Sequence, residues 1–281
     1  MYAYEGETWG DIWGFETDRY FTEDDFDGQN ADGSWNYKKG VADQTGIQTD
    51  NFVYGPGDIK FKDLDGNGII DGGDGTLENH GDLKVIGNTL PRYEYSFHLG
   101  GSYKGFDIDL FFQGVGKRSM WTQSSFAFPE MREPDLALYA NQTSYNVYDP
   151  ANGVVNISED NDYPCLYPGN EYAGNVSALA PIGGCHNYYP QSKYLVDLSY
   201  LRLKNVTLGY TLPQQLTRKA YIDKIRLYAS VNNLCLLHNG ARNLPIDPEM
   251  NDGPTGTYGY GTWGRTAPIT RSWSVGFQVY F

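Results

Sequence analysis

The residues with the clearest chemical pattern are the oxygen-bearing side chains between Asp63 and Asp74. They stand at positions 1, 3, 5, 9 and 12 of a twelve-residue loop, and the main-chain carbonyl of the residue at position 7 adds a sixth ligand: Asp63, Asp65, Asn67, Ile69, Asp71 and Asp74. A glycine, Gly68, stands at position 6, where such loops turn sharply. Hard divalent cations prefer a cage of oxygens. The spacing therefore predicts a cation-binding loop over residues 63–74 that holds a structural calcium.

The alternative for this loop is an ordinary turn rich in glycine and aspartate. Flanking helices are missing, and Asp74 stands where a bidentate glutamate is usual. Five matching side-chain donors nevertheless exceed what turn composition alone provides, so the metal interpretation is favoured.

Catalytic motifs are absent from the sequence. It contains no G-x-S-x-G, no H-E-x-x-H and no phosphate-binding glycine loop, and its four histidines are scattered. We therefore expect no catalytic residue and no organic cofactor. A calcium-dependent polysaccharide-degrading enzyme is a further alternative, supported only by abundant carboxylates.

Cys165 and Cys185 lie in one long segment that follows Val115. In an external compartment they could form a disulfide, and the alternative is two thiols. The third cysteine, Cys235, has the pattern of a strand residue.

Aromatic side chains in a second long loop could stack on sugar rings of a substrate: Tyr258, Tyr260 and Trp263. Their alternative role is to order that loop or to lie at a membrane interface.

The elements that would position these residues are strands. Between Arg92 and Val115, apolar side chains alternate with polar ones over two runs of about ten residues joined at Lys104-Gly105. The apolar residues of the first run are Tyr93, Tyr95, Phe97, Leu99 and Tyr103, and those of the second are Phe106, Ile108, Leu110 and Phe112. Period two with a tight turn predicts a β-hairpin with one apolar face.

Three more strands follow the same pattern between Tyr200 and Leu236 and over the last ten residues. In the first of them the parity slips at Asn205, which predicts a β-bulge. Long polar connections alternate with short ones, as they do in outer-membrane barrels with short periplasmic turns. We therefore expect an all-β chain that forms part of a larger transmembrane antiparallel β-barrel with long extracellular loops. A sixth strand is expected within Thr8–Phe21.

Composition restricts the partners. The chain has 281 residues and a net charge of -14, which argues against nucleic-acid binding and makes anionic lipid headgroups unlikely partners. No run of apolar residues is long enough for a transmembrane helix.

Several segments resemble, in order, the C-terminal part of SusC/RagA-family TonB-dependent outer-membrane transporters. The resemblance extends from about Gly6 onward, apart from the loops Arg118–Pro190 and Gly253–Ile269. The matching segments are GPGDIKFKDLDGNGIIDGGD, VIGNTLPRYEYSFHLGGSYKGFDIDLFFQGVGKRSMW, YLRLKNVTLGYTLP, IRLYASVNNL, IDPE and SWSVGFQVYF.

This resemblance implies a function and partners. Family members are barrels of about 22 strands with a plugged lumen, and they import oligosaccharides or peptides with a SusD-like surface lipoprotein and with energy from the TonB complex. Residues 1–281 would then be one C-terminal barrel segment in the bacterial outer membrane, in contact with its lipid, and the plug would precede residue 1. The alternative is a soluble extracellular all-β glycan-binding module with a structural calcium. The two differ in whether the apolar face meets lipid or a packed core.

The last strand carries a further expectation. Its apolar side chains recur at every second position up to an aromatic end, which resembles the signal read by the barrel-assembly machinery: Trp273, Val275, Phe277, Val279 and Phe281. The alternative is an ordinary amphipathic strand.

Overall fold

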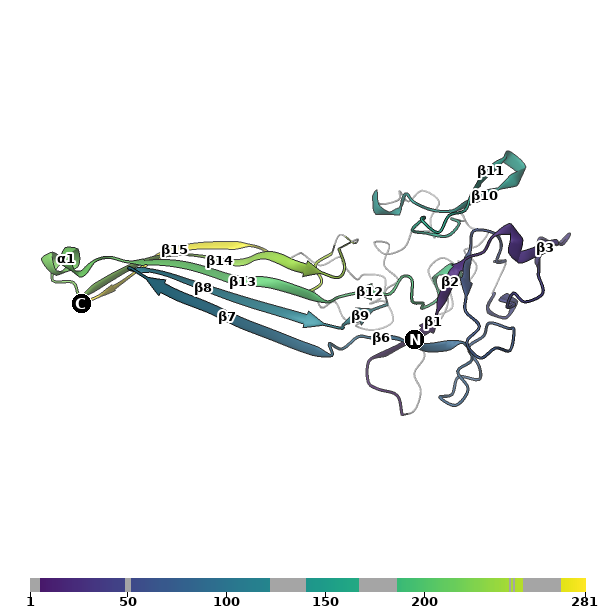
Figure 1. The fold of residues 1–281 in the computed structure, drawn as a ribbon, viewed down its shortest axis with the longest axis horizontal. Helices are drawn as coiled ribbons and strands as arrows, with labels where there is room; N and C mark the ends of the chain where they lie inside the picture. Colours follow the sequence, from purple (N-terminus) through teal and green to yellow (C-terminus); the bar gives the residue numbers. More distant parts are fainter. Residues whose placement is uncertain are drawn as a thin grey trace.

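The computed structural model describes residues 6–48, 52–121, 140–166, 186–242, 244, 246–249 and 269–281. It consists of a long five-stranded antiparallel sheet and a lobe of short strands and loops beyond one end of that sheet (Figure 1). We use "the lobe" for residues 6–48, 52–90, 140–166 and 186–195. The opposite end of the sheet carries the short connections, the helix α1 and Phe281, and we call it the turn end (Figure 1).

The sheet has the strand order β15-β14-β13-β8-β7. Its members are β7 (Tyr93–Tyr103), β8 (Phe106–Gly116), β13 (Tyr200–Thr211), β14 (Lys224–Asn239) and β15 (Ser272–Tyr280). Near the lobe, the two-residue strands β9 (Ser119–Met120) and β12 (Val196–Asp197) pair with each other. At the turn end, α1 (Gln214–Thr217) and the 3-10 helix η7 (Arg218–Ala220) connect β13 to β14.

The lobe contains four pairs of short strands and several single-turn 3-10 helices. Its strands are β1 (Asp11–Phe15), β2 (Thr17–Tyr20), β3 (Phe26–Gln29), β4 (Trp35–Tyr37), β5 (Ile59–Phe61), β6 (Leu83–Asn88), β10 (Val147–Asp149) and β11 (Val154–Asn156). The 3-10 helices are η1 (Glu23–Asp25), η2 (Thr45–Ile47), η3 (Ala140–Gln142), η4 (Pro150–Asn152) and η6 (His186–Tyr188).

The predicted hairpin is confirmed by the pairing of β7 with β8. Tyr103 lies opposite Phe106, and the two turn residues Lys104 and Gly105 both have positive φ, at 49° and 88°. Two consecutive positive φ values are the mark of the type I′ turn, whose twist matches that of the strands. The predicted bulge is also confirmed, because β13 changes register between Leu203 and Asn205 against both of its neighbours.

The pairing register sorts the side chains of the sheet into cross-strand rows on two faces. One row of the apolar face runs through Leu99, Leu110, Val206, Val231 and Trp273. This apolar face is not covered by any second layer in the part of the chain that the structure describes, and Val275 is 88% and Phe277 72% exposed. Such an uncovered face fits a wall between lipid and lumen rather than the packed core of a soluble module.

The expected sixth barrel strand within Thr8–Phe21 is wrong. The segment folds instead as β1 and β2, which pair with β6 and β5 inside the lobe. Every residue of β1 is buried, so this strand has no exposed apolar face, and Trp9, which suggested the alternation, lies before the strand and is 84% exposed. Burial on both sides removes the alternation that a barrel strand needs.

The lobe has an aromatic core of its own. Phe15 stacks on Phe61 with ring centroids 4.9 Å apart, and Phe21 contacts the ring of Phe26 at 5.1 Å. A buried polar network ties distant segments together, because Asn187 donates to the Asp58 carboxylate at 2.7 Å and accepts from the amide of Ile59. None of the helices among the described residues is long and apolar enough to cross a membrane.

Candidate functional site

The polar face of the sheet carries an ion pair that spans three strands. Arg226 on β14 donates through Nε to the Asp107 carboxylate on β8 at 3.0 Å, and its terminal nitrogen makes a second, shorter contact. The intervening strand β13 has Gly209 at this level, where a Cβ atom would collide with both partners. The glycine therefore lets the guanidinium and the carboxylate meet above the backbone of β13.

A second charged cluster lies on the same face beside the bulge of β13. Arg202 is 4% exposed and donates to both oxygens of Asp247 at 2.5 and 2.6 Å, while its Nε lies 2.8 Å from Glu249. Lys204 contacts the other oxygen of Glu249. Buried guanidinium groups require such partners. Residues 246–249, the IDPE segment, are thereby fixed against the sheet at the base of a long connection.

The sequence did not reveal this cluster in advance. IDPE stood out only as part of the family resemblance, and Arg202 only as a polar position of a strand. Arg202 and Asp247 lie 45 residues apart. The one local signal was the pair of carboxylates two positions apart, opposite two cations at the same spacing, and that signal is weak on its own.

In the predicted cation loop, the carboxylates already organise the backbone. Asp63 accepts from the amides of Gly66 and Gly68 at 2.6 and 2.9 Å, and Asp65 accepts from Asn67 at 2.9 Å. Asn67 in turn accepts from the amide of Ile69 at 2.7 Å. These bonds fix the backbone of the turn from Asp63 to Ile69.

The later donors of the loop lie in separate turns. Asp71 accepts from the amide of Gly73 at 2.7 Å, and Asp74 accepts from the hydroxyl of Thr76 at 2.7 Å. Hydrogen bonds from Thr76 lower the pKa of Asp74, with a smaller contribution from Asn79. Whether these two residues join a cation site stays a prediction.

Sequence reasoning missed Asp82. Its carboxylate is fully buried and accepts from the amides of Leu64 at 2.6 Å and Asp71 at 3.0 Å. Carboxylate oxygens of Asp63, Asp65 and Asp82 all lie within 4.8 Å of one another. Ligand oxygens 2.3–2.6 Å from a calcium ion have separations of this size, so the three residues fit a shared cation. No spacing rule indicates Asp82, because it lies beyond the twelve-residue loop.

A hollow of about 690 Å³ lies where the lobe meets the sheet. Polar and aromatic side chains line it together: Asn141, Asp162, Tyr163, Lys193, Tyr194 and Asp197. The rings of Tyr163 and Tyr194 are stacked with centroids 5.7 Å apart. This mixture suits a polar ligand with some apolar surface.

Other predicted site residues fall outside the described residues or remain predictions. Cys185, Tyr258, Tyr260 and Trp263 are outside them. Cys165 is buried in the lobe, and its predicted disulfide stays a prediction. The expected assembly-signal residues, from Trp273 to Val279, lie on β15 with Phe281 directly after it, but the signal itself is likewise a prediction.

The chain is similar to three TonB-dependent receptors of Formosa agariphila. Receptor P3 is 29% identical over 88% of this chain, P39 is 24% identical over 84%, and P26 is 25% identical over 91%. The chain spans only 19–22% of the length of these relatives. No protein-family model matches the sequence.

Among solved structures, the fold is similar to a chain of the RagAB peptide transporter. The TM-score is 0.50 at 17% identity, over 96% of this chain and 22% of the other. At that identity the match concerns the fold alone. TonB-dependent receptors are β-barrel proteins of the bacterial outer membrane. The sequence similarity to TonB-dependent receptors and the fold shared with the RagAB transporter together support the expected resemblance of this chain to part of a TonB-dependent outer-membrane transporter.

Proposed function

We propose that the chain forms part of the wall and of the external loops of an active importer for oligosaccharides or peptides. The observation that carries this proposal is the five-stranded sheet, which has one uncovered apolar face and one polar face crossed by ion pairs. Such a sheet separates lipid from a polar lumen. The chain contributes binding and containment of substrate rather than catalysis.

Partners follow from the same proposal. The lobe lies at the end of the sheet opposite the short turns (Figure 1), where a surface lipoprotein of the SusD type would meet it. The energy would come from the TonB complex through the part of the protein that contains the plug. Substrate would contact the polar face and the hollow around Lys193 and Tyr194.

A structural calcium is the second part of the proposal. Asp63, Asp65 and Asp82 supply three carboxylates at a separation that suits one cation. Hydrogen bonds from backbone amides to Asp63 and Asp65 order the loop before any ion binds. A bound divalent ion would neutralise part of their mutual repulsion. It would stabilise the edge of the lobe and take no part in transport chemistry.

The importer proposal is tested with the full-length protein in its own bacterium. A deletion strain and a strain complemented with the intact gene are compared for uptake of labelled oligosaccharides and labelled peptides, with and without a proton uncoupler. We expect uptake of one substrate class to be lost on deletion, restored by the gene and abolished by the uncoupler.

Deletion of the neighbouring lipoprotein gene provides a further arm of this experiment. It should reduce the same uptake without lowering the amount of transporter in the outer membrane. Uptake of both substrate classes that is equal in the deletion and complemented strains would contradict the proposal.

A further inference from the structure

The charge of the chain is distributed very unevenly. Its net charge is -14, but the turn end, comprising residues 101–107, 210–227 and 277–281, holds five of the 21 basic residues and two of the 35 acidic ones. One acid and one base of this set, Asp107 and Arg226, already pair with each other. The remaining charges are those of Lys104, Arg218, Lys219, Lys224 and a single acid, Asp223. The turn end is therefore locally cationic.

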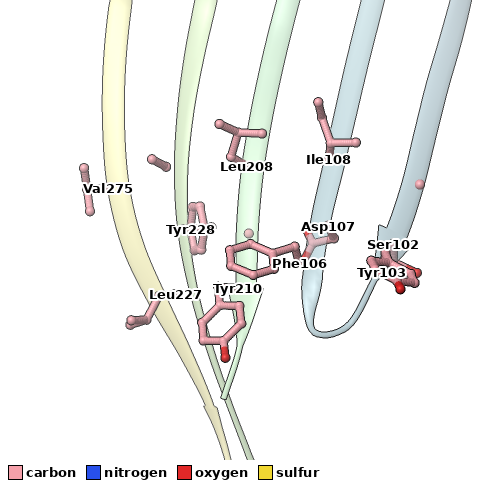
Figure 2. Close-up of a pocket in the computed structure, with 13 residues that line it drawn as sticks. Ser102, Tyr103, Phe106, Asp107, Ile108, Leu208, Tyr210, Leu227, Tyr228 and Val275 are labelled. Carbon is pink, nitrogen blue, oxygen red and sulfur yellow. The ribbon is translucent and has the colours of Figure 1, made fainter. Parts of the chain in front are cut away.

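Beside these cations, the apolar face of the sheet has a recess between two cross-strand rows, which we call the notch. One cross-strand row consists of small and aliphatic residues, Gly101, Ile108, Leu208, Ala229 and Val275. The row next to it on the side of the turn is bulkier, with Tyr103, Phe106, Tyr210, Leu227 and Phe277. The step between these rows bounds a hollow of about 750 Å³, with Ile108, Leu208 and Val275 on one side and the rings of Phe106 and Tyr210 toward the turn (Figure 2).

Gly101 leaves open space at the β7 side of the notch. A Cβ atom added there would meet nothing within 4 Å. Opposite it, Ile108 is 43% and Leu208 54% exposed. The surface is thus apolar and recessed, which suits a chain of methylene groups.

A cation stands at the mouth of the notch. The Lys104 ammonium lies 5.1 Å from the centroid of the Tyr103 ring, and that ring lines the notch. Lys104 also lines a second hollow of about 400 Å³ that shares Tyr103 and Phe106 with the first and that includes the polar-face charges Asp107, Lys224 and Arg226. An apolar recess beside an ammonium group has the chemistry to bind an anionic amphiphile.

We propose that the notch and Lys104 form a binding site for an anionic glycerophospholipid. One acyl chain lies along the row from Gly101 to Val275, and the phosphate of the headgroup contacts the Lys104 ammonium. Short turns face the periplasm in outer-membrane barrels, so the lipid belongs to the inner leaflet of that membrane. The overall acidity of the chain, which argued against anionic lipids, does not apply here because the acidic residues gather elsewhere.

The test uses the full-length protein reconstituted in nanodiscs of phosphatidylglycerol and phosphatidylcholine with identical acyl chains. Lipids retained by the protein are counted by native mass spectrometry after mild activation. One lysine near a membrane surface raises the affinity for anionic lipid about fivefold. We therefore expect the protein to retain about five times as much phosphatidylglycerol as phosphatidylcholine.

Two variants separate the two parts of the site. Lys104→Asn keeps a residue that tolerates positive φ but removes the charge, so it should abolish the preference for phosphatidylglycerol and leave retention of phosphatidylcholine unchanged. Gly101→Leu fills the notch and should lower retention of both lipids. Gly101→Ala provides a milder filling variant if the leucine prevents folding, which the heat-modifiable migration of the barrel reports.

Two control variants make comparable changes away from the notch. Gly100→Ala, on the neighbouring glycine of the opposite face, and Lys219→Gln, on η7, should retain the lipid preference. Equal retention of the two lipids by the unaltered protein would overturn the proposal. So would undiminished retention by the folded Gly101 variants, or lipopolysaccharide bound in place of phospholipid in protein taken from native membranes.

Discussion

Asp82 lies next to the acidic loop and is the third carboxylate of its proposed cation site. It is fully buried, and it joins Asp63 and Asp65 in a group of three carboxylates. Burial raises the pKa of Asp82, with added repulsion from Asp65 and Asp63, while the amides of Leu64 and Asp71 act in the opposite direction. The proposed cation site would therefore have one buried carboxylate and two nearer the surface.

The ligand set is tested by substitution in the full-length protein. Asp82→Asn should weaken calcium binding by about tenfold or more because it removes one of three charged ligands, whereas Asp74→Asn should change it much less. Thermal unfolding with calcium and with a chelator measures this, and Asp160→Asn provides an exposed acidic control. A wild-type protein whose unfolding is the same under both conditions would refute the calcium proposal.

At the scale of residues, sequence spacing indicates a tight turn from Asp63 to Ile69 but does not indicate Asp82. The local bonds from Asp63 and Asp65 follow from positions two to five residues apart. The tertiary fold brings Asp82 to the loop, because the amides of Leu64 and Asp71 donate hydrogen bonds to its carboxylate from either side. Contacts between separate turns cannot be predicted from the spacing of residues in the sequence.

At the level of elements, β13 depends on a glycine. Gly209 lies beneath the ion pair between Asp107 and Arg226, where a Cβ atom would collide with both. In an ordinary strand position an alanine is tolerated at least as well as a glycine. The ion pair reverses this preference.

Gly209→Ala should therefore destabilise the barrel by about 1–3 kcal/mol. Gly100→Ala is the matched control, because its Cβ atom would meet its neighbours at an ordinary 3.6 Å. Heat-modifiable migration of the full-length barrel measures both. If the clash is the cause, Asp107→Ala should relieve part of the effect of Gly209→Ala, and strictly additive effects would contradict this explanation.

The long strands could be predicted from alternation, and the short ones could not. Strands β7, β8 and β13 to β15 place apolar and polar side chains on opposite faces of the sheet, so period two is visible in the sequence. Strand β1 is buried along its whole length and β2 has only four residues, so neither alternates exposed apolar and polar faces as a barrel strand does. Their partners β6 and β5 were not predicted for the same reason.

For the molecule as a whole, the sheet separates two ends with different chemistry. The lobe lies at one end and the cationic turns at the other (Figure 1). If the lobe is external, a reagent that cannot pass the outer membrane should reach only that end.

Two matched substitutions test this orientation. Ala151→Cys on η4 and Ala220→Cys on η7 both place a thiol in an exposed 3-10 turn. In intact cells a membrane-impermeant maleimide should label the Ala151→Cys variant strongly, and it should label the Ala220→Cys variant only after permeabilisation of the outer membrane. The unsubstituted protein gives the background from the native cysteines, and labelling of the Ala220→Cys variant above that background in intact cells would contradict the orientation.

The strand order of the sheet also affects how this segment can fold. The outermost strands, β7 and β15, have 11 and 9 residues and each has a neighbour on one side only within the described residues. In hydrocarbon their outer amide and carbonyl groups would lack water as a substitute partner, at a cost of several kcal/mol for each unsatisfied group. The segment therefore cannot enter the membrane stepwise on its own, and its insertion must be coupled to pairing with further strands until the ring is closed.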